Sequence, residues 1–388
     1  MTAGTIDLGI RPATGGRRAP LRVLFLAQRY FPYMGGLETH VYEVARRMVD
    51  AGAEVTVLTT DTGGTLPATD EVNGVRIERV RAWPADRDYY FAPGLYRAVQ
   101  RGDWDIIHCQ GCHTLFAPLA MFAAWRSGRP YVVSFHSGGP PNGLRRAIRR
   151  AQWTALRPLL ARAQRLVAVS KSEVVSFGHD LGLAKERFTI IRNGAELPPV
   201  PAVAPQREPG TLIISPGRLQ EYKGHHRMIA ALPYIITARP DARLLILGAG
   251  PYEAELRQLA QETGVAERVE IRSIPPAHRA EMAATLAGAD IVTLLSEYEA
   301  HPIAVLEALA LRLSVLVADT SGFRELAEEG LVRAIPLESS ATAIAEAVLR
   351  QLNEPLNPGE LHLPTWDDCT GQLLDLYRDV TREAQCAS

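Results

Sequence analysis

Short apolar runs alternate with amphipathic segments along almost the whole chain, and this alternation restricts the fold more than any other feature. Residues 23–27 have the pattern of a buried strand, residues 36–51 have the apolar spacing of a helix, and residues 55–59 form a second apolar run. A strand, a helix and a strand in succession make a βαβ unit, in which the two strands pair in parallel. We therefore expect a doubly wound α/β domain.

This alternation occurs in two series on either side of a proline-rich segment, residues 197–210, which cannot continue a helix or a central strand. Further strands of the first series are expected at residues 105–108, 131–135, 166–169 and 189–191. The second series has expected strands at residues 211–215, 242–247, 269–272, 291–295 and 315–318. We predict a disordered leader (1–20), a Rossmann-like domain (21–196), a linker (197–210), a second Rossmann-like domain (211–365) and a C-terminal segment (366–388) whose helix packs back on the first domain.

Size and charge exclude several classes of protein. A chain of 388 residues is long enough for two domains. The net charge of −1 gives no bulk attraction to nucleic acid, and no apolar run is long enough to span a bilayer. The leader lacks the apolar core of a secretory signal, so we expect a cytoplasmic protein. No sequence feature indicates an oligomeric state.

The sequence from Cys109 through Cys112 to His113 matches the C-x-x-C-H pattern of c-type haem attachment. Attachment of that kind requires export, which the absence of a signal argues against. A zinc site would need two further ligands, and no second Cys/His pair has metal-binding spacing. We interpret the cysteines as structural thiols and expect no cofactor and no essential metal.

Two pairs of charged side chains follow strands of the second series. Arg218 and Lys223 follow the first of these strands, and together they suit a diphosphate whose negative charge grows as it leaves. Glu299 and Glu307 run from a loop into a helix, with Glu307 expected two turns in. Because carboxylates repel phosphates, we expect the two glutamates to bind the hydroxyls of a sugar or a ribose. The free amides at the start of the helix are expected to bind the phosphate. In isolation, a capping acid followed by a solvated helix glutamate is the favoured interpretation of this segment.

The first series carries two further candidates. Gly35 and Gly36 lie between a strand and a helix, where a backbone without side chains can approach a phosphate or a sugar, although a tight turn explains them as well. His136 follows a strand, and such a histidine can be structural or catalytic. In open α/β sheets ligands bind at the carboxyl ends of the strands, so the site is expected between the two domains.

In combination these features resemble the retaining glycosyltransferases of family four, which have the GT-B fold of two Rossmann-like domains. The motifs that carry the resemblance span nearly the whole chain after residue 20: Pro-Tyr-Met-Gly-Gly-Leu-Glu-Thr-His at 32–40, Asp-Ile-Ile-His at 105–108, Val-Ser-Phe-His-Ser at 133–137, Val-Ser-Lys at 169–171, Ile-Arg-Asn-Gly at 191–194, Gly-Arg-Leu-x-x-x-Lys-Gly at 217–224, Leu-Gly-Ala-Gly-Pro at 247–251, Ala-Asp at 289–290 and the paired glutamates. The resemblance implies transfer of a hexosyl unit from a nucleotide sugar, UDP or GDP, to a hydroxyl with retention of configuration, without metal and by attack from the face that the diphosphate leaves.

The resemblance also implies roles for individual residues. Arg218 and Lys223 would hold the pyrophosphate, Glu307 the ribose, and Glu299 and His136 would lie beside the transferred sugar. The expected donor-binding residues are Gly35, Gly36, Arg218, Lys223, Gly248, Gly250, Glu299, His301, Ile303, Ala304 and Glu307. The expected catalytic residues are His136, Arg218, Lys223 and Glu299, and the acceptor-side candidates are His113, His136 and Ser137.

The chain departs from the family pattern at residues 310–315, Ala-Leu-Arg-Leu-Ser-Val, which lack the usual glycine and proline, and at residues 271–273, which replace the usual Phe-x-Gly. Its two Asp-x-Asp sequences, at 86–88 and 103–105, do not suit a metal site.

Two other functions are compatible with the same fold. One is a silent GT-B scaffold that binds nucleotide, and the other is another GT-B enzyme such as a phosphorylase or a sugar-nucleotide epimerase.

A membrane surface is the other partner that the sequence suggests. Seven arginines from Arg145 to Arg165 decorate a helical pattern that also carries Trp153, Leu156 and Leu160. A basic amphipathic helix of this kind can lie on an anionic membrane, so peripheral contact at the inner membrane face is one reading. A solvated face of an arginine-rich helix is the other.

Overall fold

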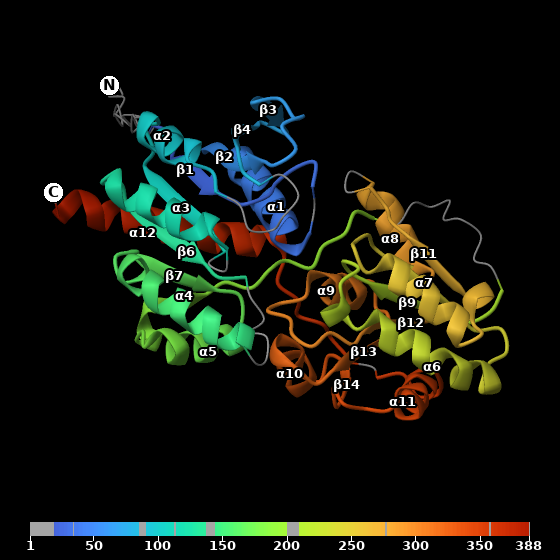
Figure 1. Cartoon of the computed structure of the whole chain (residues 1–388). Coiled ribbons are helices and arrows are strands. Elements are labelled where there is room, and N and C mark those ends of the chain that lie inside the picture. Colours follow the sequence, from blue (N-terminus) through green and yellow to red (C-terminus); the bar gives the residue numbers. More distant parts are fainter. Residues whose placement is uncertain are drawn as a thin grey trace, which may run out of the picture.

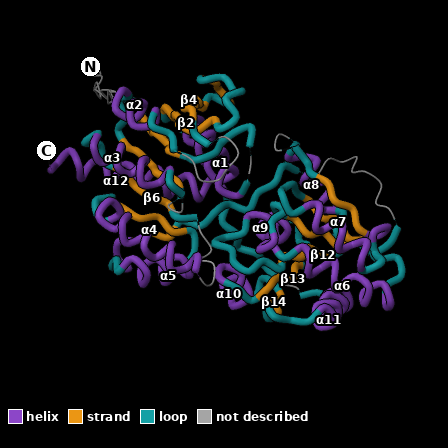
Figure 2. The backbone as a smooth tube through the Cα atoms, in the orientation of Figure 1, coloured by secondary structure: helices purple, strands orange, loops and turns teal. Residues whose placement is uncertain are grey.

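The computed structural model describes residues 19–33, 35–84, 91–111, 114–136, 144–199, 209–275, 278–356 and 358–387. They form two α/β domains side by side, each with a sheet covered by helices (Figures 1 and 2). The GT-B fold class expected from the sequence is therefore confirmed. The leader and most of the linker, residues 1–18 and 200–208, lie outside the described residues.

The first domain contains an eight-stranded sheet of order β3-β4-β2-β1-β5-β6-β7-β8, parallel except for β3. Its strands are β1 (Arg22–Leu26), β2 (Glu54–Asp61), β3 (Thr69–Val72), β4 (Val75–Arg81), β5 (Ile106–Gln110), β6 (Tyr131–Ser134), β7 (Arg165–Ala168) and β8 (Phe188–Ile190). Its helices are α1 (Gly36–Asp50), α2 (Gly94–Arg101), α3 (Phe116–Arg126), α4 (Leu144–Leu160), α5 (Lys171–Leu181) and the short η1 (Lys185–Arg187). Both faces of the central strands are covered, which explains why those strands are continuously apolar in sequence.

The second domain contains a six-stranded parallel sheet of order β11-β10-β9-β12-β13-β14. Its strands are β9 (Leu212–Pro216), β10 (Arg243–Leu247), β11 (Val269–Arg272), β12 (Ile291–Leu294), β13 (Val315–Ala318) and β14 (Arg333–Ile335). Its helices are η2 (Glu221–Lys223), α6 (His225–Ala238), α7 (Glu253–Glu262), η3 (Ala266–Arg268), α8 (Arg279–Ala287), α9 (Ile303–Ala310), α10 (Ser321–Glu328) and α11 (Ala341–Asn353). Arg312, where the family usually has glycine, adopts φ +60°, so a bulky residue here takes the left-handed conformation that ends α9.

The chain crosses between the domains twice. The second crossing leads to α12 (Trp366–Ala387), which returns to the first domain and lies along it in Figure 1. Trp366, Leu373 and Tyr377 are buried there against residues of β1 and α1. The crossings lie together, because the amide of Ala195 donates to the Pro364 carbonyl at 3.0 Å.

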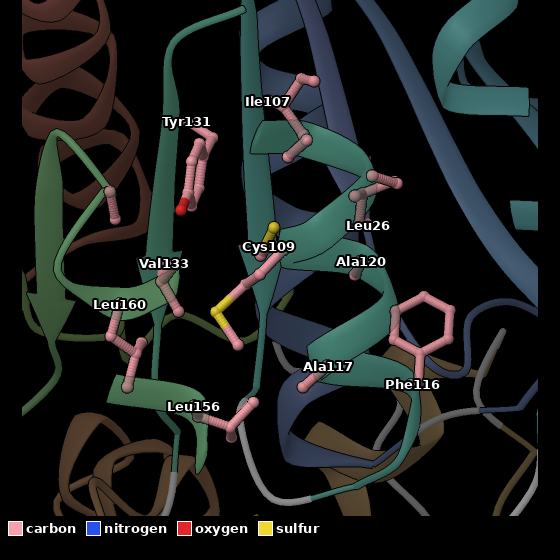
Figure 3. Packing of buried hydrophobic residues seen from close by; sticks show 14 of the residues in the cluster. Leu26, Ile107, Cys109, Phe116, Ala117, Ala120, Tyr131, Val133, Leu156 and Leu160 are labelled. Atoms are coloured by element: carbon pink, nitrogen blue, oxygen red, sulfur yellow. The ribbon is translucent and has the colours of Figure 1, made fainter. Parts of the chain in front are cut away.

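The apolar stripe of the arginine-rich helix faces the protein interior. Trp153, Leu156 and Leu160 of α4 are buried in the core of the first domain, where Figure 3 shows Leu156 and Leu160 with Val133 and Cys109. These three apolar side chains are therefore not available to a membrane, since the domain core covers them. Membrane contact through the arginines of the helix stays a prediction. Arg165 lies on β7 and not on the helix.

Candidate functional site

The order of each sheet reverses at its centre, between β1 and β5 in the first domain and between β9 and β12 in the second. A crevice forms at the carboxyl ends of strands beside such a reversal. Gly35 follows β1 and His136 follows β6, while Arg218 follows β9 and Glu299 follows β12. The topology therefore places Gly35, Arg218 and Glu299 at the two switch points, and His136 one strand away, after β6.

The arginine-bearing loop after β9 is fixed by the loop after β10. A Cβ on Gly248 would lie 1.9 Å from the Gly217 carbonyl oxygen, and one on Gly250 would lie 2.3 Å from that of Leu219. The amide of Leu219 donates to the Ala249 carbonyl at 3.0 Å. Gly248 and Gly250 thus permit the close packing that positions Arg218, which is a structural reason for glycine at both.

Lys223, after β9, and Glu299, after β12, form an ion pair at the carboxyl edge of the second sheet. Their side chains are 15% and 14% exposed. The turn before α6 makes this possible: Gly224 has φ +74°, and a Cβ there would lie 2.0 Å from the Leu295 carbonyl oxygen at the end of β12. The sequence assigned the two side chains to neighbouring parts of one ligand, and the fold brings them into contact.

An aromatic pair that the sequence did not single out borders these charges. The rings of Tyr222 and Tyr298 stack with centroids 4.7 Å apart, and Nη2 of Arg218 donates to the Tyr222 hydroxyl at 3.4 Å. Lys223 Nζ lies 5.4 Å from the Tyr222 ring. The stack limits the conformations open to both cations, which helps to preorganise them.

Helix α9 presents its amino terminus to the same region. The amides of Val305 and Leu306 donate to the Pro302 carbonyl, whereas those of Ile303 and Ala304 have no acceptor among the described residues. These two amides are available to an anion, as a helix amino terminus favours. Glu307 is the fifth residue of α9, little more than one turn in, so the expected depth of two turns is wrong.

The Glu307 carboxylate is buried and bonded to Nη2 of Arg279 at the start of α8. Burial raises the pKa of Glu307, and the Arg279 charge opposes that shift. No sequence motif had indicated Arg279, because it is 28 residues away and follows an irregular loop.

The glycine loop of the first domain lies against Arg218 of the second. A Cβ on Gly35 would lie 3.9 Å from Cδ of Arg218 and 2.7 Å from Oε2 of Glu38, whereas the space around Gly36 is open. Burial raises the pKa of Glu38, and the charges of Arg218 and Arg29 oppose that shift. Both domains therefore contribute charged groups around the Gly35 backbone.

His136 is held in a strained conformation at this cleft. Its φ is +51°, which is uncommon outside glycine and concentrates at functional sites. Its Nε2 lies 2.8 Å from Oε1 of Gln110 at the end of β5, and its ring centroid is 4.5 Å from that of His40. In the neutral tautomer that donates from Nε2, the bond to Gln110 fixes the orientation of the ring beside His40.

Behind His136 lies a buried polar network. Nδ1 of His40 bonds Oδ1 of Asn193 at 2.9 Å, and Asn193 in turn contacts His301 through its backbone amide and its side-chain amide, each at 3.2 Å. Burial lowers the pKa of His40 to about 4 and that of His301 to about 3, so both are neutral. His301, expected to bind the donor, is 8% exposed and anchors the crossing segment to the loop before α9.

Other sequence candidates are occupied elsewhere or not described. Cys109 is buried in the core of the first domain (Figure 3), and burial raises the pKa of its thiol. Asp103 and Asp105 both bond Arg22, which is a structural role. Cys112, His113 and Ser137 lie outside the described residues. Within the described ranges, no three His, Cys, Asp or Glu side chains form a potential metal group.

Two family descriptions together match most of the chain. Glycosyltransferase Family 4 matches residues 34–197, and Glycosyl transferases group 1 matches residues 201–362. The chain is 26% identical over 378 residues to GDP-mannose:cellobiosyl-diphosphopolyprenol alpha-mannosyltransferase of Xanthomonas oryzae, covering 93% of this chain and 97% of that protein. It is 29% identical over 332 residues to D-inositol 3-phosphate glycosyltransferase of Thermobispora bispora, covering 76% and 77%.

Solved structures share the fold over nearly the whole chain. Sucrose-phosphate synthase from Thermosynechococcus elongatus superposes with a TM-score of 0.77 at 20% identity, covering 94% of this chain and 100% of that one. Anabaena HepE in complex with UDP and glucose superposes with a TM-score of 0.69 at 19% identity, covering 95% and 99%. With both domain families matched in order on this fold, the chain belongs to the family four glycosyltransferases and transfers sugar from a nucleotide sugar to an acceptor.

Proposed function

We propose that the protein moves a hexosyl unit from UDP- or GDP-hexose to an acceptor hydroxyl with retention of configuration and without an essential metal. One observation supports this most: Arg218, the Lys223–Glu299 pair and the amides of Ile303 and Ala304 gather at the switch point of the second sheet, opposite Gly35. Cations and amides bind the diphosphate, and the carboxylate binds sugar hydroxyls.

In the proposed reaction the anomeric carbon–oxygen bond breaks and the nucleoside diphosphate leaves. Arg218 and Lys223 stabilise the charge that develops on it, in the place a metal ion takes in other transferases. The acceptor hydroxyl attacks from the face that the diphosphate vacates and gives its proton to a departing phosphate oxygen. Glu299 and His136 orient the sugar. The inference of retention rests on the family resemblance.

The acceptor is proposed to carry phosphate and to bind the first domain. The names of the two relatives above specify, respectively, a diphosphopolyprenol and an inositol 3-phosphate. The two acceptors share a phosphate group beside the sugar or cyclitol.

A membrane-facing surface is proposed on α3 rather than on the apolar stripe of α4. Phe122 and Trp125 are 41% and 39% exposed, and the guanidinium groups of Arg162 and Arg126 lie 4.9 and 5.8 Å from the Trp125 ring. An exposed tryptophan ring with two guanidinium groups beside it suits an anionic interface. On this basis we propose peripheral contact at the inner membrane face. Among the described helices, none is long and apolar enough to cross a bilayer.

The test is a panel of UDP-, GDP-, ADP- and dTDP-hexoses offered to the purified protein, with binding and slow hydrolysis measured and Arg218→Ala as the control. Binding and hydrolysis of one donor by wild type alone support the proposal, and the anomer of the transferred sugar decides retention. Binding without hydrolysis or transfer favours the silent scaffold. Phosphate-dependent cleavage without nucleotide, or isomerised nucleotide sugar without acceptor, indicates a phosphorylase or an epimerase instead.

A further inference from the structure

The ion pair between Arg279 and Glu307 links two elements that no sequence motif connects. Arg279 is the first residue of α8, and its Nη2 bonds Oε1 of Glu307 on α9. Their side chains are 22% and 6% exposed, so the carboxylate is almost wholly removed from water. A buried carboxylate needs a partner to remain charged.

The charges around Glu307 show that Arg279 favours the ionised form of its carboxylate. Among the described residues, Arg279 on α8 favours the ionised carboxylate, while Glu43 on α1 opposes it. Burial acts in the same direction as Glu43 and raises the pKa. Arg279 is therefore the group that opposes both the burial and the second carboxylate.

The Arg279 guanidinium is held at this carboxylate. Its Nη2 is anchored on Glu307, and its Nε is buried. Arg272 on β11 is instead paired with Glu270 at 2.9 Å.

We propose that Arg279 is a positioning residue for the nucleoside end of the donor and sets its specificity for ribose: it orients the Glu307 carboxylate toward the ribose hydroxyls. This rests on the proposed function, in which Glu307 binds ribose. A carboxylate oriented by a guanidinium is a charge-assisted acceptor for a diol, and a 2′,3′-dideoxyribose has no hydroxyls for it.

The test measures dissociation constants for GDP, UDP and their 2′,3′-dideoxy analogues by calorimetry from about pH 5.5 to 8.5. Wild type is expected to prefer the ribonucleotides with little change over this range. Near pH 6, Arg279→Met is expected to bind about tenfold more weakly than wild type and to lose the preference for ribose. Both the affinity and the preference are expected to recover at higher pH, as Glu307 ionises. Arg279→Lys keeps a cation beside Glu307 and is expected to restore the wild-type pH profile and the preference for ribose.

The outcomes are separable. If wild type binds neither GDP nor UDP, the proposed function and this inference both fail. If wild type binds and Arg279→Met keeps the wild-type pH profile and ribose preference, the inference alone is overturned. Arg257→Met on neighbouring α7 removes an exposed arginine and is the matched control. Arg279→Lys decides the question if the methionine variant does not fold.

Discussion

His40 Nδ1 lies 2.9 Å from Oδ1 of Asn193, and this bond joins the first helix of one domain to the segment that crosses to the other. Asn193 also donates to the His301 carbonyl, so its amide satisfies groups on both sides. Asn193→Ala leaves both buried partners unpaired. It is expected to lower the free energy of unfolding by about 1–3 kcal/mol. Urea unfolding measures this, and Gln258→Ala on exposed α7 is expected to change little. Equal stability of the two variants would contradict the structural role of the network.

Buried neutral histidines predict acid sensitivity. Burial lowers the pKa of His40 and His225 to about 4 and that of His301 to about 3. Below the unfolded value of about 6.5 the unfolded chain binds protons that the folded chain does not, so stability falls as the pH drops from there toward about 4. Each histidine contributes a slope of about 1.4 kcal/mol per pH unit within that window. His40→Gln should reduce the slope of the unfolding free energy against pH by about 1.4 kcal/mol per pH unit, which corresponds to one proton. An unchanged slope would show that His40 does not titrate in this way.

The Lys223–Glu299 pair predicts a loss of turnover larger than the loss of donor binding. Lys223→Ala removes the cation that stabilises the leaving diphosphate and leaves Glu299 without its partner. We expect kcat to fall by about 100-fold or more, with a smaller change in the donor KM. Steady-state kinetics with the donor found in the panel measures both. Lys185→Ala, an exposed lysine of the first domain, is the control; wild-type kcat in Lys223→Ala would remove the residue from catalysis.

Local patterns predicted the order of the elements well, because strand and helix periodicity depends on neighbouring residues. The strands at 269–272 and 315–318 have the expected bounds, and the site residues after β9 and β12 follow from the topology. The edge strand β3 and its neighbour β4 were not predicted: β3, Thr-Asp-Glu-Val, has little apolar character, and β4 alternates polar and apolar residues.

Residues whose partners lie far away in sequence were missed. His40 and Asn193 are 153 positions apart, and Arg279 reaches Glu307 only because α8 and α9 converge. His40 and Asn193 did lie in family motifs, where a polar residue interrupts an apolar pattern, and that was the available signal. The sidedness of α4 could not be read either, since periodicity shows an apolar face but not whether protein or lipid covers it.

The α3 surface predicts salt-sensitive binding to anionic membranes. Trp125 is exposed beside Arg126 and Arg162, so its ring can enter the interface while the guanidinium groups contact phosphates. The protein is expected to sediment with vesicles of anionic lipid, to be released by salt, and to bind zwitterionic vesicles weakly. Trp125→Ser with Arg162→Gln should reduce the bound fraction several-fold. The lost charge alone weakens the membrane-binding free energy by about 1 kcal/mol, and the loss of the tryptophan ring weakens it further. Arg257→Gln with Arg350→Gln, on the second domain, removes two positive charges instead of one and should nevertheless bind like wild type. Equal losses in both double variants would mean that net charge, and not the α3 surface, governs the attraction.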